Sequence, residues 1–344
     1  MNRIAALVLA PLLASACSQS DAPQAGDAPE AVSGAATPLW STLDGQPPLV
    51  IAHRGASGLR PEHSQAAYQL ALEQGADVIE PDLVMSADGV LIVRHDPYLS
   101  HSTDIANRPE FADRRSVIMG REDWWVPTFT ASELRTLTAS QTMEDRDQSY
   151  NGQFPVMTFE DFLGFVAAEE ERCACVIAIE PEVKLPAEFT AMGLDPLPAL
   201  LAALEAHDLN RADAPVVIQS FDAPFLQRLD AVSELPLAML YAGPDAEGAN
   251  AGGLSLEEIA QFADGIGAYK SLLLTPEGDS TGFVEQAHAL GLEVHVWTVR
   301  DDREPLTGET VQDELRALYA VGVDGVFTDF PATAVTVCDQ MASE

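Results

Sequence analysis

Positive charge is scarce in this chain. Its 344 residues include 54 Asp and Glu against 18 Lys and Arg, for a formal net charge of −36, and just two are lysines, Lys184 and Lys270. A surface this acidic repels nucleic acids and anionic membranes, so we expect no nucleic-acid partner and disfavour a bilayer substrate. A solvated acidic surface is the plain interpretation. An anionic substrate would need positive charges of its own at the site.

Long apolar runs are also missing from the chain beyond its N-terminus. A helix that spans a bilayer would need roughly 20 such residues in a row. The first 16 residues fit a signal peptide, with Arg3, an apolar stretch over residues 4–13 and a small-residue cleavage site. Cys17 follows directly, so we expect a lipoprotein-type signal with the lipid on Cys17. Ordinary cleavage after Ala16 is the alternative. Either reading predicts export, and the first predicts a periplasmic protein whose one membrane contact is this anchor.

Cysteine is rare too, with Cys173, Cys175 and Cys338 left after removal of the signal. The C-x-C pair lacks the partners of a zinc site. Export permits a disulfide, in which Cys338 could pair with either of the other two. Overall we expect structural cysteines, either buried or joined in a single pair.

Residues 17–48 are rich in Ala, Pro, Gly, Ser and Asp, which predicts a flexible tether. After the tether, short β-branched runs alternate with helical patterns. This alternation predicts a parallel sheet covered on both faces, over residues 49–340. Candidate strands are 49–53, 77–84, 90–95, 175–184, 215–221, 237–241, 265–268, 293–299 and 325–328, nine for the eight places of a barrel, so one is extra or hairpin-paired. Candidate helices are 64–74, 158–171, 196–207, 223–229, 256–262, 281–290 and 310–321. Residues 98–154 break the rhythm and predict an insertion over the site, after the third candidate strand.

Two short clusters place a histidine at the end of a candidate strand. His53-Arg54-Gly55 closes the first strand, where barrel enzymes hold catalytic groups, and arginine offers a planar donor pair for phosphate. A structural histidine is the alternative there. His95-Asp96 supplies a second histidine with a carboxylate near enough to orient it. Two histidines of near-neutral pKa could share base and acid duties.

Two further clusters are acidic. In E-P-D at 80–82 both carboxylates point the same way, and their repulsion would be costly without a cation. Oxygen ligands of this kind suit Ca²⁺ or Mg²⁺, although an outward solvated pair is the alternative. In E-P-E-V-K at 180–184 the two glutamates and Lys184 share a strand face, and a structural salt bridge is the alternative. A strand rises about 3.3 Å per residue, so Glu180 should lie deeper than Glu182, which makes Glu182 the expected metal ligand.

Together the motifs HRG, PEHS, E-x-D-L, DGVLIVRHD, E-x-K, QSFD, WTV and DGVFTDFP, from about Val50 to Pro331, resemble the glycerophosphodiester phosphodiesterase family, and most closely its bacterial periplasmic branch. The resemblance implies a TIM-type (β/α)8 barrel and a divalent cation, with Ca²⁺ preferred to Mg²⁺. Carried over residue by residue, it implies an acid–base pair of His53 and His95, substrate contacts from Arg54, Lys184, Glu62, Gln219, Phe221 and Trp297, and metal ligands Glu80, Asp82 and Glu182. Phe221 and Trp297 could equally be core residues, and Asp329 is expected to be a structural loop residue.

The expected activity is hydrolysis of small glycerophosphodiesters to sn-glycerol 3-phosphate and an alcohol. A phospholipase-D-like sphingomyelinase on the same barrel and a surface-anchored binding protein on an inactive barrel are the alternatives. Four positions depart from the family pattern: His63 and Ser64 stand for the common Asn-Thr, Arg300 stands where many members have Asn, and Glu180 adds a carboxylate that many members lack.

Overall fold

The computed structural model describes residues 40–243 and 253–344. The expected signal segment 1–16, Cys17 and residues 18–39 of the expected tether lie outside the described residues. Residues 40–48, which the sequence assigned to the tether, belong to the folded domain. Trp40 is buried edge-on against Tyr319, and the Leu43 amide donates to Asp324 at 2.6 Å. The folded part therefore starts earlier than Leu49, because an apolar ring outside the candidate strands contributes to the core.

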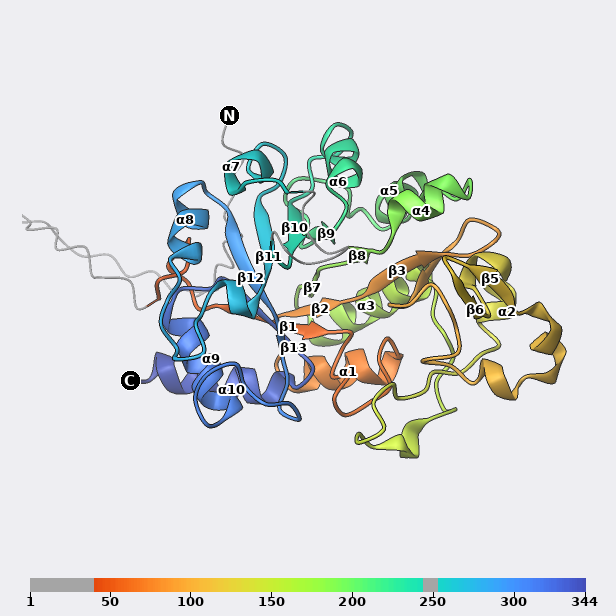
Figure 1. Cartoon of the computed structure of the whole chain (residues 1–344), viewed down its shortest axis with the longest axis horizontal. Helices are drawn as coiled ribbons and strands as arrows, with labels where there is room; N and C mark the ends of the chain where they lie inside the picture. Colours follow the sequence, from red (N-terminus) through yellow and green to blue (C-terminus); the bar gives the residue numbers. More distant parts are fainter. Residues whose placement is uncertain (1–39, 244–252) are drawn as a thin grey trace, which may run out of the picture.

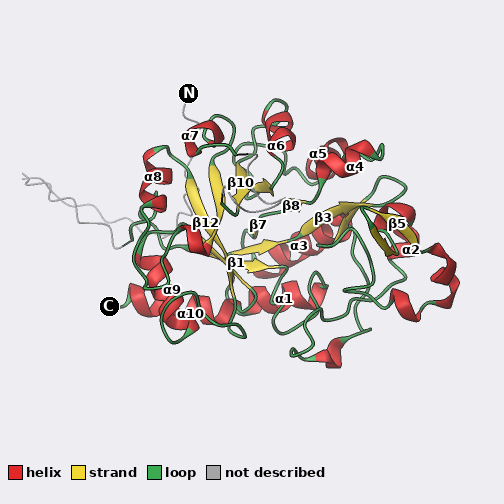
Figure 2. Ribbon diagram, viewed as in Figure 1, coloured by secondary structure: helices red, strands yellow, loops and turns green. Residues whose placement is uncertain are grey.

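Eight parallel strand positions close into a barrel, as expected (Figure 2). In chain order they are β1 (Leu49–His53), β2 (Val78–Glu80) with β3 (Asp82–Met85), β7 (Ala178–Ile179) with β8 (Glu182–Val183), β9 (Ile218–Ser220), β10 (Leu237–Tyr241), β11 (Gly265–Tyr269), β12 (Glu293–Val299) and β13 (Gly325–Thr328). Each position pairs with its neighbours in chain order, and β13 pairs with β1 to close the ring. The carboxyl ends of all eight positions therefore meet at one mouth.

Two of the eight positions are broken in the middle by proline. The sequence predicted continuous strands over 77–84 and 175–184, but Pro81 separates β2 from β3 and Pro181 separates β7 from β8. Proline has no N–H to donate to the ladder, which explains the interruption. The carbonyls of these prolines still accept, Pro81 from the Glu182 amide at 2.9 Å and Pro181 from the Gln219 amide at 3.0 Å. Both breaks adjoin the glutamates and the aspartate of the acidic clusters.

The ninth candidate strand is the hairpin partner. β4 (Leu91–Val93) pairs antiparallel with β3, so it extends one barrel position and does not occupy a place of its own. Its carboxyl end leads to His95 and Asp96 and then into the insertion. The insertion contains four short 3-10 segments (Ile105–Asn107, Pro109–Arg114, Val126–Thr128 and Gln148–Tyr150), an antiparallel pair of β5 (Ser116–Ile118) and β6 (Arg121–Asp123), and α2 (Ala131–Leu134).

Helices cover the outside of the barrel (Figure 1). They are α1 (Gln65–Glu73), α3 (Phe159–Cys173), α4 (Pro186–Ala191), α5 (Pro196–Ala206), α6 (Ala223–Asp230), α7 (Leu256–Ile259), α8 (Phe283–Ala289), α9 (Val311–Ala320) and α10 (Pro331–Ala342), with a further 3-10 turn at Lys270–Leu272. Side-chain caps set several starts: Ser64 accepts from the Ala67 amide, and Thr158 and Thr310 form capping boxes. Helices α4 and α10, both of which begin at a proline, were not among the helices that the sequence predicted. No helix within 40–243 or 253–344 is long and apolar enough to cross a bilayer.

The cysteines pair differently from the expectation. The structure joins Cys173 to Cys175, and Cys338 on α10 is a free, half-buried thiol. A pairing of Cys338 with either partner is therefore wrong. Residues two apart can approach here because α3 ends at Cys173 and Ala174 adopts a left-handed conformation, with φ of 53°.

Candidate active site

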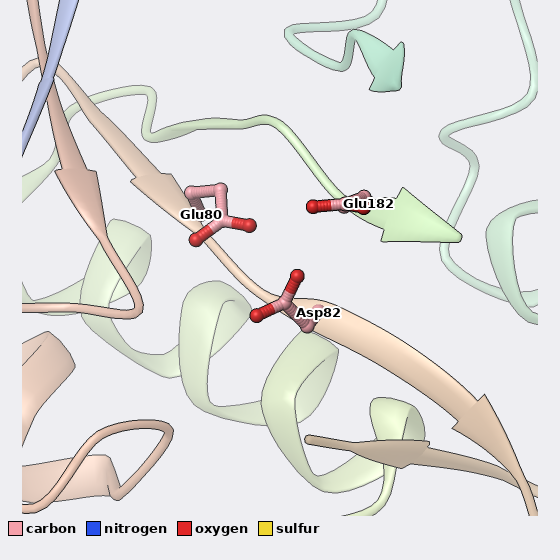
Figure 3. Close-up of side chains that lie close together, drawn as sticks. All are labelled: Glu80, Asp82 and Glu182. Atoms are coloured by element: carbon pink, nitrogen blue, oxygen red, sulfur yellow. The ribbon is translucent and has the colours of Figure 1, made fainter. Parts of the chain in front are cut away.

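Three buried carboxylates converge at the mouth of the barrel. Glu80 ends β2, Asp82 begins β3 and Glu182 begins β8, and one oxygen of each lies within 4.8 Å of the other two. Figure 3 shows the three side chains turned toward one another. These are the three residues that the sequence predicted as metal ligands, brought together by the pairing of Asp82 with Glu182 in adjacent strands.

Like charges and burial dominate the electrostatics of this cluster. Burial raises the pKa of Glu80 well above its usual range, and Asp82 adds to the rise. Burial likewise raises the pKa of Glu182 to about 7, with Asp82 adding to the rise and the Lys184 ammonium opposing it. Burial alone would raise the pKa of Asp82 as well, but Lys184 and Arg54 hold it well below its usual range. Two carboxyls that resist ionisation beside an ionised one are the pattern expected of a site that a cation neutralises.

The donor set fits a hard divalent cation. All three groups offer oxygen, the ligand type of Ca²⁺ and Mg²⁺, and none offers the nitrogen or sulfur that Zn²⁺ prefers. Asp82 Oδ1 is buried and accepts no hydrogen bond from any residue in the described part of the chain, so a ligand position is open there. With Glu62 included, four carboxylates face the two cations Arg54 and Lys184, and a divalent ion would balance the remaining charge.

Two cationic side chains border the carboxylates. Lys184 Nζ lies 2.7 Å from Glu182 Oε1 and 3.6 Å from Asp82 Oδ1. Arg54 Nη1 donates to Glu62 Oε2 at 3.0 Å, and its amide donates to Glu80 Oε2 at 2.8 Å. The Arg54 Nε lies 3.2 Å from Asp82 Oδ2 without hydrogen-bond geometry, so this N–H stays available to an anion. Burial would raise the pKa of Glu62, but Arg54 lowers it to about 2, which keeps the pair charged.

His53 forms a dyad with Asp329, the residue that follows β13. Its Nδ1 lies 2.7 Å from Asp329 Oδ1. Burial would raise the pKa of Asp329, but His53 and the two guanidinium groups Arg146 and Arg300 hold it well below its usual range. An ionised carboxylate can only accept, so His53 Nδ1 carries the proton and Nε2 is left as an acceptor. Burial and Arg54 lower the pKa of His53 to about 4, so the ring is neutral at pH 7.

His95 forms a second dyad, with Asp96. Its Nδ1 lies 2.8 Å from Asp96 Oδ1, as the sequence suggested for an orienting carboxylate. Asp96 Oδ2 lies 2.7 Å from Nδ1 of His101, a residue of the insertion. Burial, Arg54 and Lys184 lower the pKa of His95. The ring is near the cluster, since its charge would lower the pKa of both Glu62 and Asp82.

Residues that the sequence treated as minor turn out to support this site. Asp329 is not the plain loop residue we expected, because it holds His53, and its place directly after a barrel strand was the signal for this. His63 is buried with Nε2 2.9 Å from Asp82 Oδ2 and Nδ1 2.9 Å from the Tyr68 hydroxyl. Glu180 lies outside the carboxylate cluster, with Oε1 3.0 Å from His295 Nδ1. Nothing in the sequence pointed to the contacts of His101 or Arg146.

The predicted pocket residues Gln219 and Trp297 lie on β9 and β12, and Phe221 directly follows β9. Gln219 is opposite Glu182 in the β8–β9 register, and its Nε2 donates to the Glu180 carbonyl at 3.1 Å. Phe221 and Trp297 pack edge to face, with ring centroids 5.7 Å apart, and the Phe221 ring lies 5.9 Å from Lys184 Nζ. Trp297 Nε1 donates to the Gly267 carbonyl at 2.7 Å. Both rings are partly exposed, so they can border a ligand as well as pack against each other.

Comparison with known proteins agrees with this geometry. Residues 53–333 match the Glycerophosphoryl diester phosphodiesterase family. A glycerophosphodiester phosphodiesterase of Arabidopsis thaliana is 33% identical over 82% of this chain and 84% of its own, and one of Haemophilus influenzae is 31% identical over 83% and 88%. A solved structure from Silicibacter pomeroyi superimposes with a TM-score of 0.66 at 26% identity, covering 89% of this chain and 97% of that one. An Oleispira antarctica phosphodiesterase in complex with the product sn-glycerol-3-phosphate gives 0.63 at 22% identity over 87% and 99%, a likeness of fold. The chain belongs to the glycerophosphoryl diester phosphodiesterase family.

Proposed function

We propose that this protein is a metal-dependent phosphodiesterase that hydrolyses glycerophosphodiesters to sn-glycerol 3-phosphate and an alcohol. Glycerophosphodiester phosphodiesterase activity follows from membership of the family and from the curated relatives. The observation that carries the proposal is the juxtaposition, at one barrel mouth, of a buried carboxylate trio, two cations and two His–Asp dyads. The Oleispira antarctica structure, which holds sn-glycerol 3-phosphate on the same fold, supports the choice of product.

Glu80, Asp82 and Glu182 would hold the cation, and all three offer oxygen, the ligand type of both Ca²⁺ and Mg²⁺. The resemblance to the family implies that Ca²⁺ is preferred to Mg²⁺. When bound, the cation supplies charge that stabilises the phosphoryl oxygens. Arg54 and Lys184 add fixed positive charge for the phosphate, against the acidic surface of the rest of the molecule. Glu62 orients Arg54, and Gln219, Phe221 and Trp297 border the remainder of the substrate.

The two histidines divide the proton transfers. His53 is the more enclosed, with its side chain 14% exposed against 34% for His95, and its pKa of about 4 keeps it unprotonated. His53 Nε2 is therefore suited to take the proton of the attacking hydroxyl, whether of water or of the glycerol 2-position. His95, which reaches solvent and can be reprotonated, is suited to give a proton to the departing alkoxide as the P–O bond breaks. Asp329 holds His53 in the Nδ1–H tautomer, which leaves its Nε2 free to accept a proton, and Asp96 accepts from Nδ1 of His95, so that Nε2 of the protonated His95 ring carries the proton that it gives.

Metal removal tests this function directly. Protein starting at residue 40 should hydrolyse glycerophosphocholine, lose the activity in excess EDTA and regain it with Ca²⁺ or Mg²⁺. Released glycerol 3-phosphate is the measurement, with sphingomyelin vesicles assayed in parallel as the lipid control. Full activity of metal-stripped protein would remove the cation from the mechanism. Turnover of sphingomyelin in place of glycerophosphocholine would assign the barrel to lipid chemistry.

The location is a proposal from the sequence. Residues 1–16 fit an export signal and Cys17 a lipid attachment point, which favours an anchored periplasmic enzyme of the bacterial periplasmic branch. Cys17→Ser should move the protein from the membrane fraction to the soluble exported fraction, or leave the precursor uncleaved. Fractionation of cells carrying either form measures this. A Cys17→Ser protein that is processed normally and stays with the membrane would contradict the anchor.

A further inference from the structure

Each His–Asp dyad ends on a residue of the insertion. Asp96 follows β4 and Asp329 follows β13, so the two aspartates are far apart in the sequence. Each uses one carboxylate oxygen to contact its histidine. The second oxygen of each carboxylate meets a side chain from residues 98–154: His101 on Asp96 and Arg146 on Asp329. The same segment therefore reaches both candidate acid–base groups, through one intermediate each.

His101 leaves Asp96 little freedom to rotate. Its Nδ1 lies 2.7 Å from Asp96 Oδ2 while His95 Nδ1 lies 2.8 Å from Asp96 Oδ1, so both carboxylate oxygens are engaged. Without His101 the carboxylate could turn toward solvent, and the His95 ring would lose the partner that fixes its tautomer and plane. The His101 side chain is 49% exposed, so it contributes little to the core.

Arg146 holds Asp329 from the other side. Nη2 lies 2.6 Å from Asp329 Oδ2, and the same guanidinium binds Asp302 at 2.7 Å and the Ser57 carbonyl at 3.2 Å. The side chain is 4% exposed, so the ion pair is shielded from water. Arg300 also reaches Asp329 Oδ2, at 2.8 Å, but it comes from the barrel. Arg146 thus ties the insertion to the carboxylate that orients His53.

Other contacts also attach the insertion to the barrel. Gln141 donates to the Ser57 and Arg60 carbonyls at 3.0 and 3.2 Å, and Arg303 pairs with Asp145 at 2.8 Å. These attachments join the insertion to the barrel without touching Asp96 or Asp329. The contacts of His101 and Arg146 differ from them in ending on the two carboxylates that orient histidines.

We propose that His101 and Arg146 are positioning residues, through which the insertion completes both acid–base dyads. The inference rests on the proposed roles of His53 and His95. The insertion then contributes to catalysis without contacting the substrate. His101 and Arg146 hold Asp96 and Asp329 in place, and these two carboxylates orient the imidazoles of His95 and His53. Loss of either residue should slow the chemical step while substrate binding is kept, because the groups that touch phosphate and metal are unaltered.

The test compares variants that remove the donor with variants that keep one. His101→Leu removes the donor to Asp96, and His101→Asn keeps an N–H near the position of Nδ1. Arg146→Met and Arg146→Lys form the corresponding pair at Asp329. Arg135→Met is the matched control, because it breaks the ion pair between Arg135 of the insertion and Asp161 of α3, which does not reach either dyad. His53→Ala and His95→Ala give the reference loss of at least about 100-fold in kcat.

We expect His101→Leu and Arg146→Met to lower kcat roughly 10-fold with KM for glycerophosphocholine unchanged. His101→Asn and Arg146→Lys should recover most of the lost kcat, and Arg135→Met should match the parent. Unchanged kcat in His101→Leu, or equal loss in His101→Leu and His101→Asn, would overturn the proposal. Because His101 is half exposed, its pair of variants decides the matter even if Arg146→Met fails to fold. Normal kcat in His53→Ala and His95→Ala would instead overturn the proposed function beneath it.

Discussion

Glu180 and Glu182 illustrate at the residue scale how strand geometry separates two similar side chains. Alternation along a strand puts both on one face, yet Glu182 joins Glu80 and Asp82 while Glu180 pairs with His295 in the interior. The Glu180–His295 pair is a matched one, because burial would lower the pKa of His295 but Glu180 raises it to about 9. Two glutamates separated by a single proline therefore have different roles, one at the mouth of the barrel and one in its interior.

Substitution of the two glutamates should give different phenotypes. Glu182→Gln removes a charged ligand, so we expect cation affinity to fall about 10- to 100-fold and activity with it. Glu180→Gln keeps the three ligands, so its cation affinity should stay near that of the parent while thermal stability falls, since His295 loses a buried partner. Calorimetric Ca²⁺ titration and thermal unfolding of both variants measure this. Normal binding by Glu182→Gln with binding lost in Glu180→Gln would reverse the assignment.

The motifs identified the residues at the centre of the site but not the residues that hold them in place. Strand-end carboxylates, histidines and the rare Lys184 could be read from the sequence because each chemistry needs that residue type at that place. The sequence placed Asp329 directly after a barrel strand but did not indicate its partner, because the hydrogen bond to His53 joins residues 276 apart in the chain. His101 and Arg146 lie in a segment without periodicity, so no pattern fixed which way they face.

At the element scale, the β1–α1 loop shows why glycine follows Arg54. Gly55 has φ of +82°, and a Cβ there would lie 2.6 Å from the carbonyl carbon of Ala67 in the first turns of α1. The helix thus packs directly on the loop that carries Arg54, whose amide donates to Glu80. Gly89, in the turn between β3 and β4, has φ of +77° but no atom within 4 Å of such a Cβ.

This contrast makes a matched pair of substitutions. Gly55→Ala and Gly89→Ala each incur the left-handed backbone cost of about 1 kcal/mol. Gly55→Ala must also push α1 away from the loop, so we expect a larger fall in Tm and a loss of roughly 10- to 100-fold in kcat/KM as Arg54 shifts. Gly89→Ala should lower Tm modestly and leave kcat/KM intact. Equal effects of the two changes on both quantities would show that α1 does not set the position of Arg54.

Element boundaries were predictable where the local signal was strong. The predicted helices over 64–74, 158–171 and 310–321 start at the residues that cap them in the structure, Ser64, Thr158 and Thr310, and β-branched runs marked the strands. The pairing of β4 with β3 could not be read from the sequence, because a buried apolar run looks the same in a barrel position and in a hairpin. The breaks inside the strands depend on which carbonyls around Pro81 and Pro181 still accept hydrogen bonds from the neighbouring strands. That pairing is a property of the closed barrel.

At the scale of the whole molecule, a net charge of −36 surrounds a site meant for phosphate. Close to the site, Arg54, Lys184 and the proposed cation would offset this charge. Far from it the negative surface dominates, over a Debye length of about 30 Å at 10 mM salt but only about 8 Å at 150 mM. The field should therefore act on the approach of a substrate more than on its binding, and in proportion to the substrate's net charge.

Two substrates of the same class separate this effect from others. Glycerophosphocholine is a zwitterion, since its phosphate is balanced by the trimethylammonium group, whereas glycerophosphoglycerol is a monoanion. Raising NaCl from 10 to about 150 mM should increase kcat/KM for the anion several-fold, because screening removes long-range repulsion, and should leave the zwitterion nearly unchanged. The ratio of the two values at each salt concentration is the measurement, because effects of salt on folding or on cation affinity cancel in it. A ratio independent of salt would mean that the local charges at the mouth outweigh the surface at every distance. A ratio that moves toward glycerophosphocholine would mean that the mouth attracts anions from afar, so that the acidic surface has no part in substrate selection.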